Sequence, residues 1–391
     1  MEIIIGINFI PVLKDTVSGS FKYKMGGSIA TSHFSGLTDY EVIQVNRKFI
    51  ACIISIVLIL NLTACGNEKL KRFDASFLEL FDTVTTITGY AKDKEEFTGY
   101  AQMIHDNLQE YHELYDIYND YDGVNNIKTI NDNAGIKPVK VDQRIIDMLK
   151  FAKEAYDLTG GQMNVAFGAV LRVWHDYRTK GVDDPENAQL PPMDLLKERA
   201  EHTDINKVII NENDSTVYLE DPEMSLDVGA VAKGYATERV AEIVYENGFK
   251  SGSISVGGNV RTLGPKADTG EAWNIGIQNP DHESKDKYLY ILNLENMSLV
   301  TSGVYERYYT VDGKQYHHII DPDTLMPSDE YLSISIVTKD SGMADVLAKI
   351  INMPYEEGLT LIESIPDTEA LWVFKNGEMK YSSHFEDYIK K

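Results

Sequence analysis

Cysteine is almost missing from this chain of 391 residues, which contains only Cys52 and Cys65. Cys52 lies in an apolar run that reads as a removable targeting segment, so the mature chain is expected to keep Cys65 alone. One cysteine cannot form an intramolecular disulfide. The sequence also has no C-x-x-C pair, no P-loop and no G-x-S-x-G elbow, which removes the usual signs of thiol redox, nucleoside-triphosphate and serine-hydrolase sites.

Basic residues are in short supply. The chain has 37 Lys and Arg against 61 Asp and Glu, a formal net charge of −24. This balance excludes a general nucleic-acid binder, which needs basic surface to neutralise phosphates. Apolar residues make up 43% of the chain, enough for a substantial core, and no Pro/Ser-rich linker divides it. We expect one intertwined domain over residues 78–391.

Long hydrophobic runs are also missing. The largely apolar run Phe49–Leu60 is too short to cross a hydrocarbon core of about 30 Å. It follows Arg47 and Lys48, an order typical of a signal peptide. The alternative is a short buried helix.

The sequence Leu-Thr-Ala-Cys ending at Cys65 resembles a bacterial lipobox, whose cysteine is lipidated. We therefore expect a signal peptide over 45–64 and a lipid-anchored tether over 65–77, on the outer face of the bacterial cell membrane. Residues 1–44 are then a non-native N-terminal extension.

The residue pattern predicts an α+β fold of mixed strands and helices without regular βαβ alternation. The expected strands are 81–90, 253–256, 273–277, 289–294 and 331–337, with hairpins pairing 208–210 with 216–219 and 371–374 with 379–381. The expected helices are 94–113, 142–158, one that opens near Asp227 and closes at Asn247-Gly248, and one that starts near Ala344.

Residues 226–234 read Leu-Asp-Val-Gly-Ala-Val-Ala-Lys-Gly and are the most informative segment for function. An acid, a glycine turn and a lysine stand where a helix is expected to begin. The N–H groups at a helix N-terminus favour phosphate. Many helices begin with Asp and Gly, so this segment alone is a weak signal.

Four further segments offer chemistry, and each also has a purely structural interpretation. Gly257-Gly258 could approach a ligand or form a bulge. The segment 301–307 offers hydroxyls and an arginine. His317 and His318 point to opposite faces of an extended chain, so at most one is expected to face a site. Asp345 and Lys349 could be a surface ion pair at i,i+4 spacing.

In this order, the segments resemble the ApbE-type FAD:protein FMN transferases. The resemblance runs from about Phe81 to the C-terminus and is most specific at 226–235, 256–259, 301–303, 318–322 and 344–345. It implies an enzyme that cleaves FAD, transfers FMN through a phosphoester bond to a threonine or serine of a partner protein, and releases AMP with Mg²⁺.

The resemblance also implies roles for individual residues. It implies FAD contacts from Phe81, Tyr121, Gln162, Met163, Asn164, Asp227, Lys233, Gly257, Gly258 and Ile320. It implies that the carbonyl of Ala230 and the carboxylate of Asp345 face the metal. His318 is the candidate general base, with an ordinary pKa near neutrality.

Two positions depart from the family pattern. Lys349 stands where a metal-binding threonine is common, four residues after Asp345, and Leu325 stands where glycine is usual. An ammonium group cannot coordinate a cation, yet a requirement for Mg²⁺ is still expected.

The acceptor motif of the family's substrates, Ser/Thr-Gly-Ala-Thr after an acid, is absent from this chain. The expected partner is therefore another, extracytoplasmic protein that carries it. Two alternatives remain open: an FAD pyrophosphatase that produces FMN and AMP, and a non-enzymatic FAD-binding lipoprotein.

Overall fold

The computed structural model describes residues 69–78, 80–281, 283–305 and 307–391. The expected N-terminal extension, signal peptide and lipidated Cys65 lie outside these residues. Within these ranges, no helix has the length and apolar character needed to cross a membrane.

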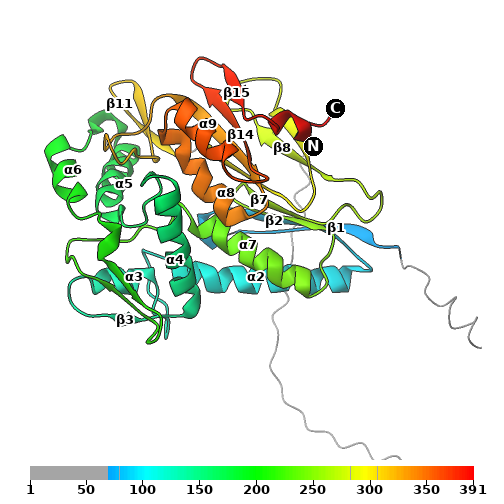
Figure 1. Ribbon diagram of the computed structural model, residues 1–391, viewed down its shortest axis with the longest axis horizontal. Coiled ribbons are helices and arrows are strands. Elements are labelled where there is room, and N and C mark those ends of the chain that lie inside the picture. Colours follow the sequence, from blue (N-terminus) through cyan, green and yellow to red (C-terminus); the bar gives the residue numbers. More distant parts are fainter. Residues whose placement is uncertain (1–68, 79, 282, 306) are drawn as a thin grey trace, which may run out of the picture. The chain divides into compact units, whose positions relative to one another are not determined.

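An antiparallel sheet of eight strands organises the described part of the chain, in the order β1-β2-β6-β7-β10-β13-β14-β15 (Figure 1). These strands are β1 (Lys71–Phe77), β2 (Thr85–Ala91), β6 (Gly252–Val256), β7 (Asn259–Leu263), β10 (Ser298–Gly303), β13 (Tyr331–Thr338), β14 (Glu369–Phe374) and β15 (Met379–Tyr381). The sheet joins β2 to β6, so it is built from segments far apart in sequence.

Alternating side chains make both faces of the sheet apolar. In β14, Ala370 and Trp372 face one buried cluster, while Leu371 and Val373 face another. The helices α7 (Ala232–Glu246), α8 (Ser341–Leu347) and α9 (Tyr355–Glu363) pack on strands of the sheet. The hairpin of β8 (Trp273–Gln278) and β9 (Tyr288–Leu294) contributes to the cluster of Leu371 and Val373.

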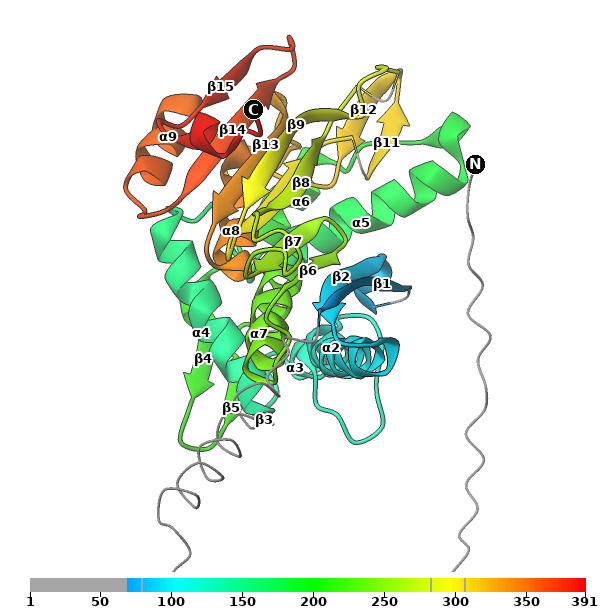
Figure 2. The ribbon, with the colours of Figure 1, turned by 90° about the vertical axis from the view of Figure 1, so that its right-hand side faces the viewer.

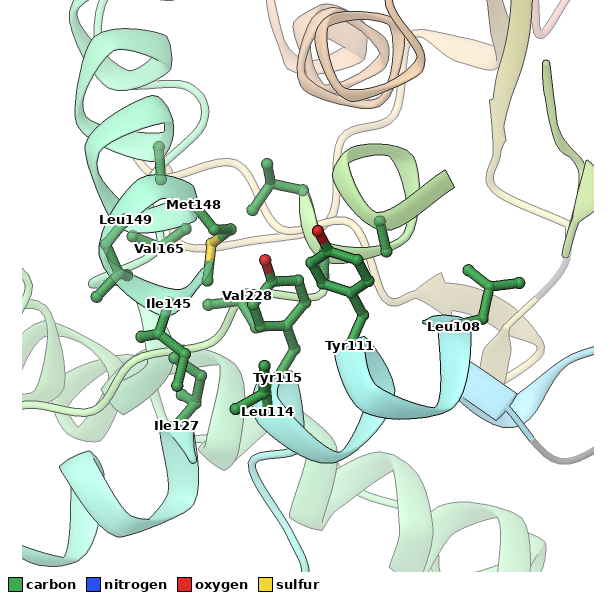
Figure 3. Close-up of a cluster of buried hydrophobic side chains, with 14 of the residues drawn as sticks. Leu108, Tyr111, Leu114, Tyr115, Ile127, Ile145, Met148, Leu149, Val165 and Val228 are labelled. Atoms are coloured by element: carbon green, nitrogen blue, oxygen red, sulfur yellow. The ribbon is translucent and has the colours of Figure 1, made fainter. Parts of the chain in front are cut away.

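A helical layer extends the core away from the sheet. It contains α2 (Lys94–Tyr115), α3 (Ile127–Asp132), α4 (Gln143–Leu158) and the small sheet of β3 (Val139–Lys140), β5 (Thr216–Leu219) and β4 (Val208–Asn211). In Figure 3, Tyr115 of α2 lies beside Met148 and Ile145 of α4, and Tyr111 and Leu108 follow along α2 away from α4, within the same buried cluster. Val228, from the segment singled out above, lies in the same cluster.

A fourth buried cluster forms beside these layers. It joins α5 (Gly168–Asp183) and α6 (Met193–Ala200) to the hairpin of β11 (Tyr308–Val311) and β12 (Lys314–His317) (Figure 2). The indole N–H of Trp174 on α5 donates to the carbonyl of Leu325 at 3.0 Å. Leu325 keeps the left-handed backbone that glycine would adopt easily, with φ of 61°.

Short 3₁₀ segments complete the described elements. They are η1 (Leu80–Asp82), η2 (Pro185–Asn187), η3 (Ile205–Lys207), η4 (Ala348–Asn352) and η5 (Phe385–Tyr388).

Local signals predicted many of these elements and missed others, among them β7, β10, α3, α5, α6 and α9. The helix over 142–158 begins after Asp142, whose side chain accepts from the Arg144 N–H. Both predicted hairpins form, and the second turns at Asn376-Gly377, where Gly377 has a φ of 84°.

Four boundaries were wrong. Residues 81–84 are not strand, because Phe81 and Asp82 adopt left-handed backbone. Residues 71–77 are not tether but the edge strand β1, paired with β2. The helix expected to open near Asp227 is α7, which starts at Ala232. The helix expected to start near Ala344 is α8, which starts at Ser341, so Asp345 lies in its interior.

Close contact between α7 and α8 positions the site. A Cβ atom on Gly234 of α7 would lie 2.3 Å from the carbonyl oxygen of Ser341 and 2.5 Å from Cβ of Asp345. Glu238 of α7 strengthens the contact, since it accepts from the N–H of Ser341 at 2.7 Å and pairs with Arg261 of β7 at 2.9 Å. The backbones of α7 and α8 can approach this closely at Gly234 because this residue has no side chain.

Gly234→Ala is expected to destabilise the protein by about 1–3 kcal/mol, because its methyl group has no space between the helices. Gly99→Ala is the matched control: Gly99 is exposed in α2 with nothing within 4 Å of an added Cβ, so it should stabilise by about 0.5–1 kcal/mol. Urea unfolding measures both. Equal effects from the two substitutions would contradict the packing argument.

Candidate active site

A large pocket of about 1250 Å³ opens between the sheet, α5 and the loop that precedes α7. Its wall draws on residues from Phe81 to Asn352. It contains all but one of the candidate site residues: Phe81, Gln162, Met163, Asn164, Asp227, Ala230, Lys233, Gly257, Gly258, His318, Ile320 and Asp345. Tyr121 is the exception. The pocket therefore brings the predicted site residues together.

Asp345 is the buried acid of the pocket wall, with a side chain only 2% exposed. Its Oδ2 accepts the N–H of Gly234 at 3.0 Å and lies 4.0 Å from Nζ of Lys233. This carboxylate occupies the N-terminal end of α7, where a negative charge is stabilised. The helix end predicted to receive phosphate thus already holds a protein anion.

Lys349 contacts the other carboxylate oxygen. Its Nζ lies 3.6 Å from Oδ1 of Asp345 and donates to Oγ of Ser302 at 3.3 Å. Burial lowers the pKa of Lys349, and the charge of Asp345 partly offsets that effect. The surface ion pair considered above is therefore a buried contact in the pocket wall.

The donor set around Asp345 does not fit a protein-bound magnesium site. Mg²⁺ is usually held by one or two carboxylates together with substrate phosphates and water, so Asp345 is the side chain that decides the fit. Mg²⁺ needs oxygen ligands at 2.0–2.1 Å in octahedral geometry. Here two ammonium groups lie within 4.0 Å of the one candidate carboxylate, and they would repel a divalent cation.

His318 is a neutral imidazole facing the pocket. Its Nδ1 lies 3.2 Å from the carbonyl oxygen of Arg307, so Nδ1 carries the proton and Nε2 is free to accept one. Removal from water, together with the positive charges of Lys349, Arg307 and Arg178, lowers the pKa of His318 to about 3.

His317 has a structural role. It is buried, its Nε2 lies 2.6 Å from the carbonyl oxygen of Ser328, and its Nδ1 accepts the N–H of Ile319. Both ring nitrogens are thus occupied by the backbone, which leaves His318 as the available base.

Asp227 precedes α7 in a tight turn. Its Oδ1 accepts the N–H of Gly229 at 2.9 Å, and its own N–H donates to the carbonyl of Val165. Burial raises the pKa of this carboxyl, with Lys233 among the groups that oppose the rise. The turn places the Asp227 carboxylate and Lys233 on one pocket wall.

Gly257-Gly258 is the turn of the β6–β7 hairpin, not a bulge. Val256 pairs with Asn259, and both glycines have positive φ, 56° and 89°, as in a type I′ turn. A Cβ on Gly257 would lie 2.5 Å from Oγ1 of Thr83, whereas one on Gly258 would meet nothing within 4 Å. Gly258 therefore leaves an open edge in the pocket.

A hydrogen-bond chain holds Phe81 in its left-handed conformation. The Phe81 N–H donates to Nδ1 of His112 at 3.2 Å, so Nε2 of His112 donates to Tyr121 Oη at 3.3 Å. Tyr121 in turn donates to Oδ2 of Asp116 at 2.7 Å. Tyr121 thus lies behind the pocket wall and supports its lining residue His112.

The segment 162–164 contributes polar groups around a buried anchor. Met163 is almost fully buried, and Asn164 donates to the carbonyl of Thr203 at 3.0 Å. Gln162 donates to Asp323 at 3.2 Å, while its buried Oε1 has no protein partner. That oxygen is an available acceptor at the pocket.

Three basic side chains of α5 were not predicted. Arg172, His175 and Arg178 all line the pocket, and Nη2 of Arg178 lies 3.1 Å from Nδ1 of His175. Their i, i+3, i+6 spacing places them along one helical face. That spacing was a readable signal, but α5 itself was not predicted.

The chain is similar to proteins of known family. The ApbE family model matches residues 81–372. The chain is 32% identical over 278 residues to the FAD:protein FMN transferase of Treponema pallidum, covering 68% of this chain and 75% of that protein. It is also 32% identical to one from Klebsiella pneumoniae, covering 66% and 77%.

Solved structures share this architecture. The ApbE protein from Thermotoga maritima superposes with a TM-score of 0.71 at 25% identity, covering 82% of this chain and all of that one. The flavin transferase ApbE from Vibrio cholerae gives 0.68 at 23% identity, covering 82% and 99%.

Nuclear magnetic resonance tests the state of His318. With ¹⁵N-labelled histidine, its imidazole signals are expected to stay those of the Nδ1–H tautomer from pH 5 to 8, because a pKa of about 3 leaves the ring neutral throughout. His318→Gln identifies the signals by their loss. A titration step near the ordinary value of about 6.5 would contradict the argument.

Proposed function

The chain belongs to the ApbE family of flavin transferases, and from that premise we propose that it transfers FMN from FAD to a hydroxyl group of an acceptor protein through a phosphoester bond. One observation carries this proposal. A neutral imidazole, His318, and two lysines, Lys233 and Lys349, line one large pocket.

Charge in the pocket favours a pyrophosphate substrate. Although the chain has a net charge of −24, Lys349, Arg307 and Arg178 act together on His318. Phosphoryl transfer depends on neutralising charge and on positioning the reacting groups. The pocket wall also carries acids, among them Asp82, Asp116 and Asp176. The cations nearest His318, and not the charge of the whole wall, are therefore proposed to bind the phosphates of FAD.

His318 accepts the proton in this scheme. The acceptor hydroxyl oxygen attacks the phosphorus on the FMN side of the pyrophosphate, and the bond from that phosphorus to the bridging oxygen breaks. The bridging oxygen leaves on AMP with the electron pair, while Nε2 of His318 takes the hydroxyl proton and releases it to solvent. The tautomer held by Arg307 leaves Nε2 free to accept a hydrogen bond from the acceptor hydroxyl. The negative phosphates of bound FAD would offset the nearby positive charges that lower the pKa of His318, and so raise it toward the range of a general base.

The acceptor is proposed to be an extracytoplasmic protein that carries the Ser/Thr-Gly-Ala-Thr motif. Its reactive hydroxyl would enter beside His318, which is only half-buried. The family resemblance implies a magnesium requirement, whereas the two lysines beside Asp345 offer a different source of positive charge.

Intact-mass measurement tests the transfer. The purified protein is incubated with FAD, MgCl₂ and an acceptor domain that carries the motif. The acceptor is expected to gain the mass of FMN less one water, with one AMP released per acceptor. His318→Gln should slow this by about 10²–10⁴-fold.

His384→Gln is the matched control. The exposed His384 side chain contacts Asp387, its backbone N–H donates to the Glu369 carboxylate, and none of these residues lines the pocket. This substitution should leave the rate unchanged. AMP with free FMN and an unmodified acceptor would identify a pyrophosphatase instead, and unchanged bound FAD would identify a binding protein.

We also propose that Cys65 is lipidated and anchors the protein to the outer face of the cell membrane. The support is the sequence alone, a short apolar run followed by Leu-Thr-Ala-Cys. Cys65→Ser is expected to move the protein from the membrane to the soluble fraction of a bacterial host. An unchanged membrane fraction would refute lipidation at this residue.

A further inference from the structure

Lys349 places a positive charge inside the pocket wall. The residue follows Asp345 by one helical turn, its side chain is 17% exposed, and its Nζ contacts Oδ1 of Asp345 and Oγ of Ser302. An anion on one side and a hydroxyl on another fix the position of the ammonium group. Its remaining proton is directed by neither partner and is available to a ligand.

Lys233 approaches the same carboxylate from α7. Its Nζ lies 4.0 Å from Oδ2 of Asp345, and the N–H of Gly234 reaches that oxygen at 3.0 Å. Both oxygens of Asp345 therefore face donors from the protein. A divalent cation at this carboxylate would have to displace them and sit beside two like charges.

Both lysines face a pocket in which they could bind an anionic ligand. Both line it together with Asp345 and the open edge at Gly258. Asp345 itself faces two ammonium groups, and burial raises the pKa of Asp227, the other carboxyl on the wall beside Lys233, which disfavours its charged form. The two lysines are therefore placed to bind a pyrophosphate group.

We propose that Lys349 supplies the positive charge that a divalent cation would otherwise supply, so that this chain binds FAD and cleaves its pyrophosphate without a bound metal. The inference rests on the proposed function. In the transfer step, Lys349 forms no covalent bond. With Lys233, it neutralises the phosphates while the acceptor oxygen bonds to phosphorus, AMP departs with the bridging oxygen and His318 takes the proton.

The first test compares transfer rates in excess EDTA and in MgCl₂, using the full-length protein. The wild type is expected to keep its rate within about twofold. Lys349→Thr, which restores a hydroxyl ligand, should lose about 100-fold in EDTA and recover in MgCl₂. Lys349→Met, which has neither charge nor ligand, should be slow in both.

Lys150→Thr is the matched control, since Lys150 is on α4 and pairs with exposed Glu212. It should behave as the wild type in both buffers. A wild type that needs MgCl₂ for turnover would overturn the inference, as would a Lys349→Thr variant that is indifferent to EDTA.

A second test does not depend on turnover. Quenching of flavin fluorescence measures FAD binding in EDTA, where Lys349→Met should bind at least about 10-fold more weakly than the wild type, as expected for loss of a charged hydrogen bond. Calorimetric titration with MgCl₂ should detect binding to Lys349→Thr and none to the wild type. Equal FAD affinities, or magnesium binding by the wild type, would overturn the inference.

The two tests separate the inference from the proposed function. No transfer in either buffer, combined with metal-free FAD binding that needs Lys349, would refute the transferase proposal and support the role of Lys349. Transfer that occurs only with MgCl₂ would support the transferase and refute that role.

Discussion

The hydrogen bond between the buried Asp345 carboxylate and the N–H of Gly234 is the interaction on which the site depends. It links α8 to the first turn of α7, and it can form because Gly234 has no side chain in the space between the helices. The same carboxylate holds Lys233 and Lys349 at one pocket wall. The position of Asp345 therefore determines both how closely α7 and α8 pack and where the two lysine charges lie. A substitution at any of these residues is expected to change both the packing and the charge of the pocket wall.

The charge around His318 differs in sign from the net charge of the chain. The chain is strongly acidic, yet His318 experiences three positive side chains and little water. These conditions favour the neutral ring, and the carbonyl of Arg307 selects which nitrogen keeps the proton. Net charge argues against a general nucleic-acid binder, but only the folded pocket shows where positive side chains gather.

Sequence patterns of a few neighbouring residues predicted the helix caps and turns, because contacts between near neighbours determine these structures. The α4 cap at Asp142 and the turn at Asn376-Gly377 were read from a few neighbouring residues. Phe81 was misassigned because its backbone depends on His112, which is 31 residues away. Strand β1 carries a readable alternation of apolar residues at Phe73, Ala75 and Phe77, but the segment was assigned to the tether that follows Cys65.

Most of the site was predicted through resemblance to a family rather than through spacing. No periodicity relates Asp345 to Gly234, which is 111 positions earlier. Arg172, His175 and Arg178 have a readable helical spacing, but the helix that carries them was not recognised. The consequence of Lys349 also needed coordinates, because the sequence shows the lysine but not its burial against Asp345 and Ser302.

The wide span of the pocket wall, from Phe81 to Asn352, has a consequence for how the protein matures. Strand β2 can find its neighbour β6 only after more than 160 residues have followed it, so loop closure makes this pairing slow. The cavity then forms only when nearly the whole chain is available. No early fragment contains a complete binding surface, and the ability to capture a flavin nucleotide arises at the last stage of folding.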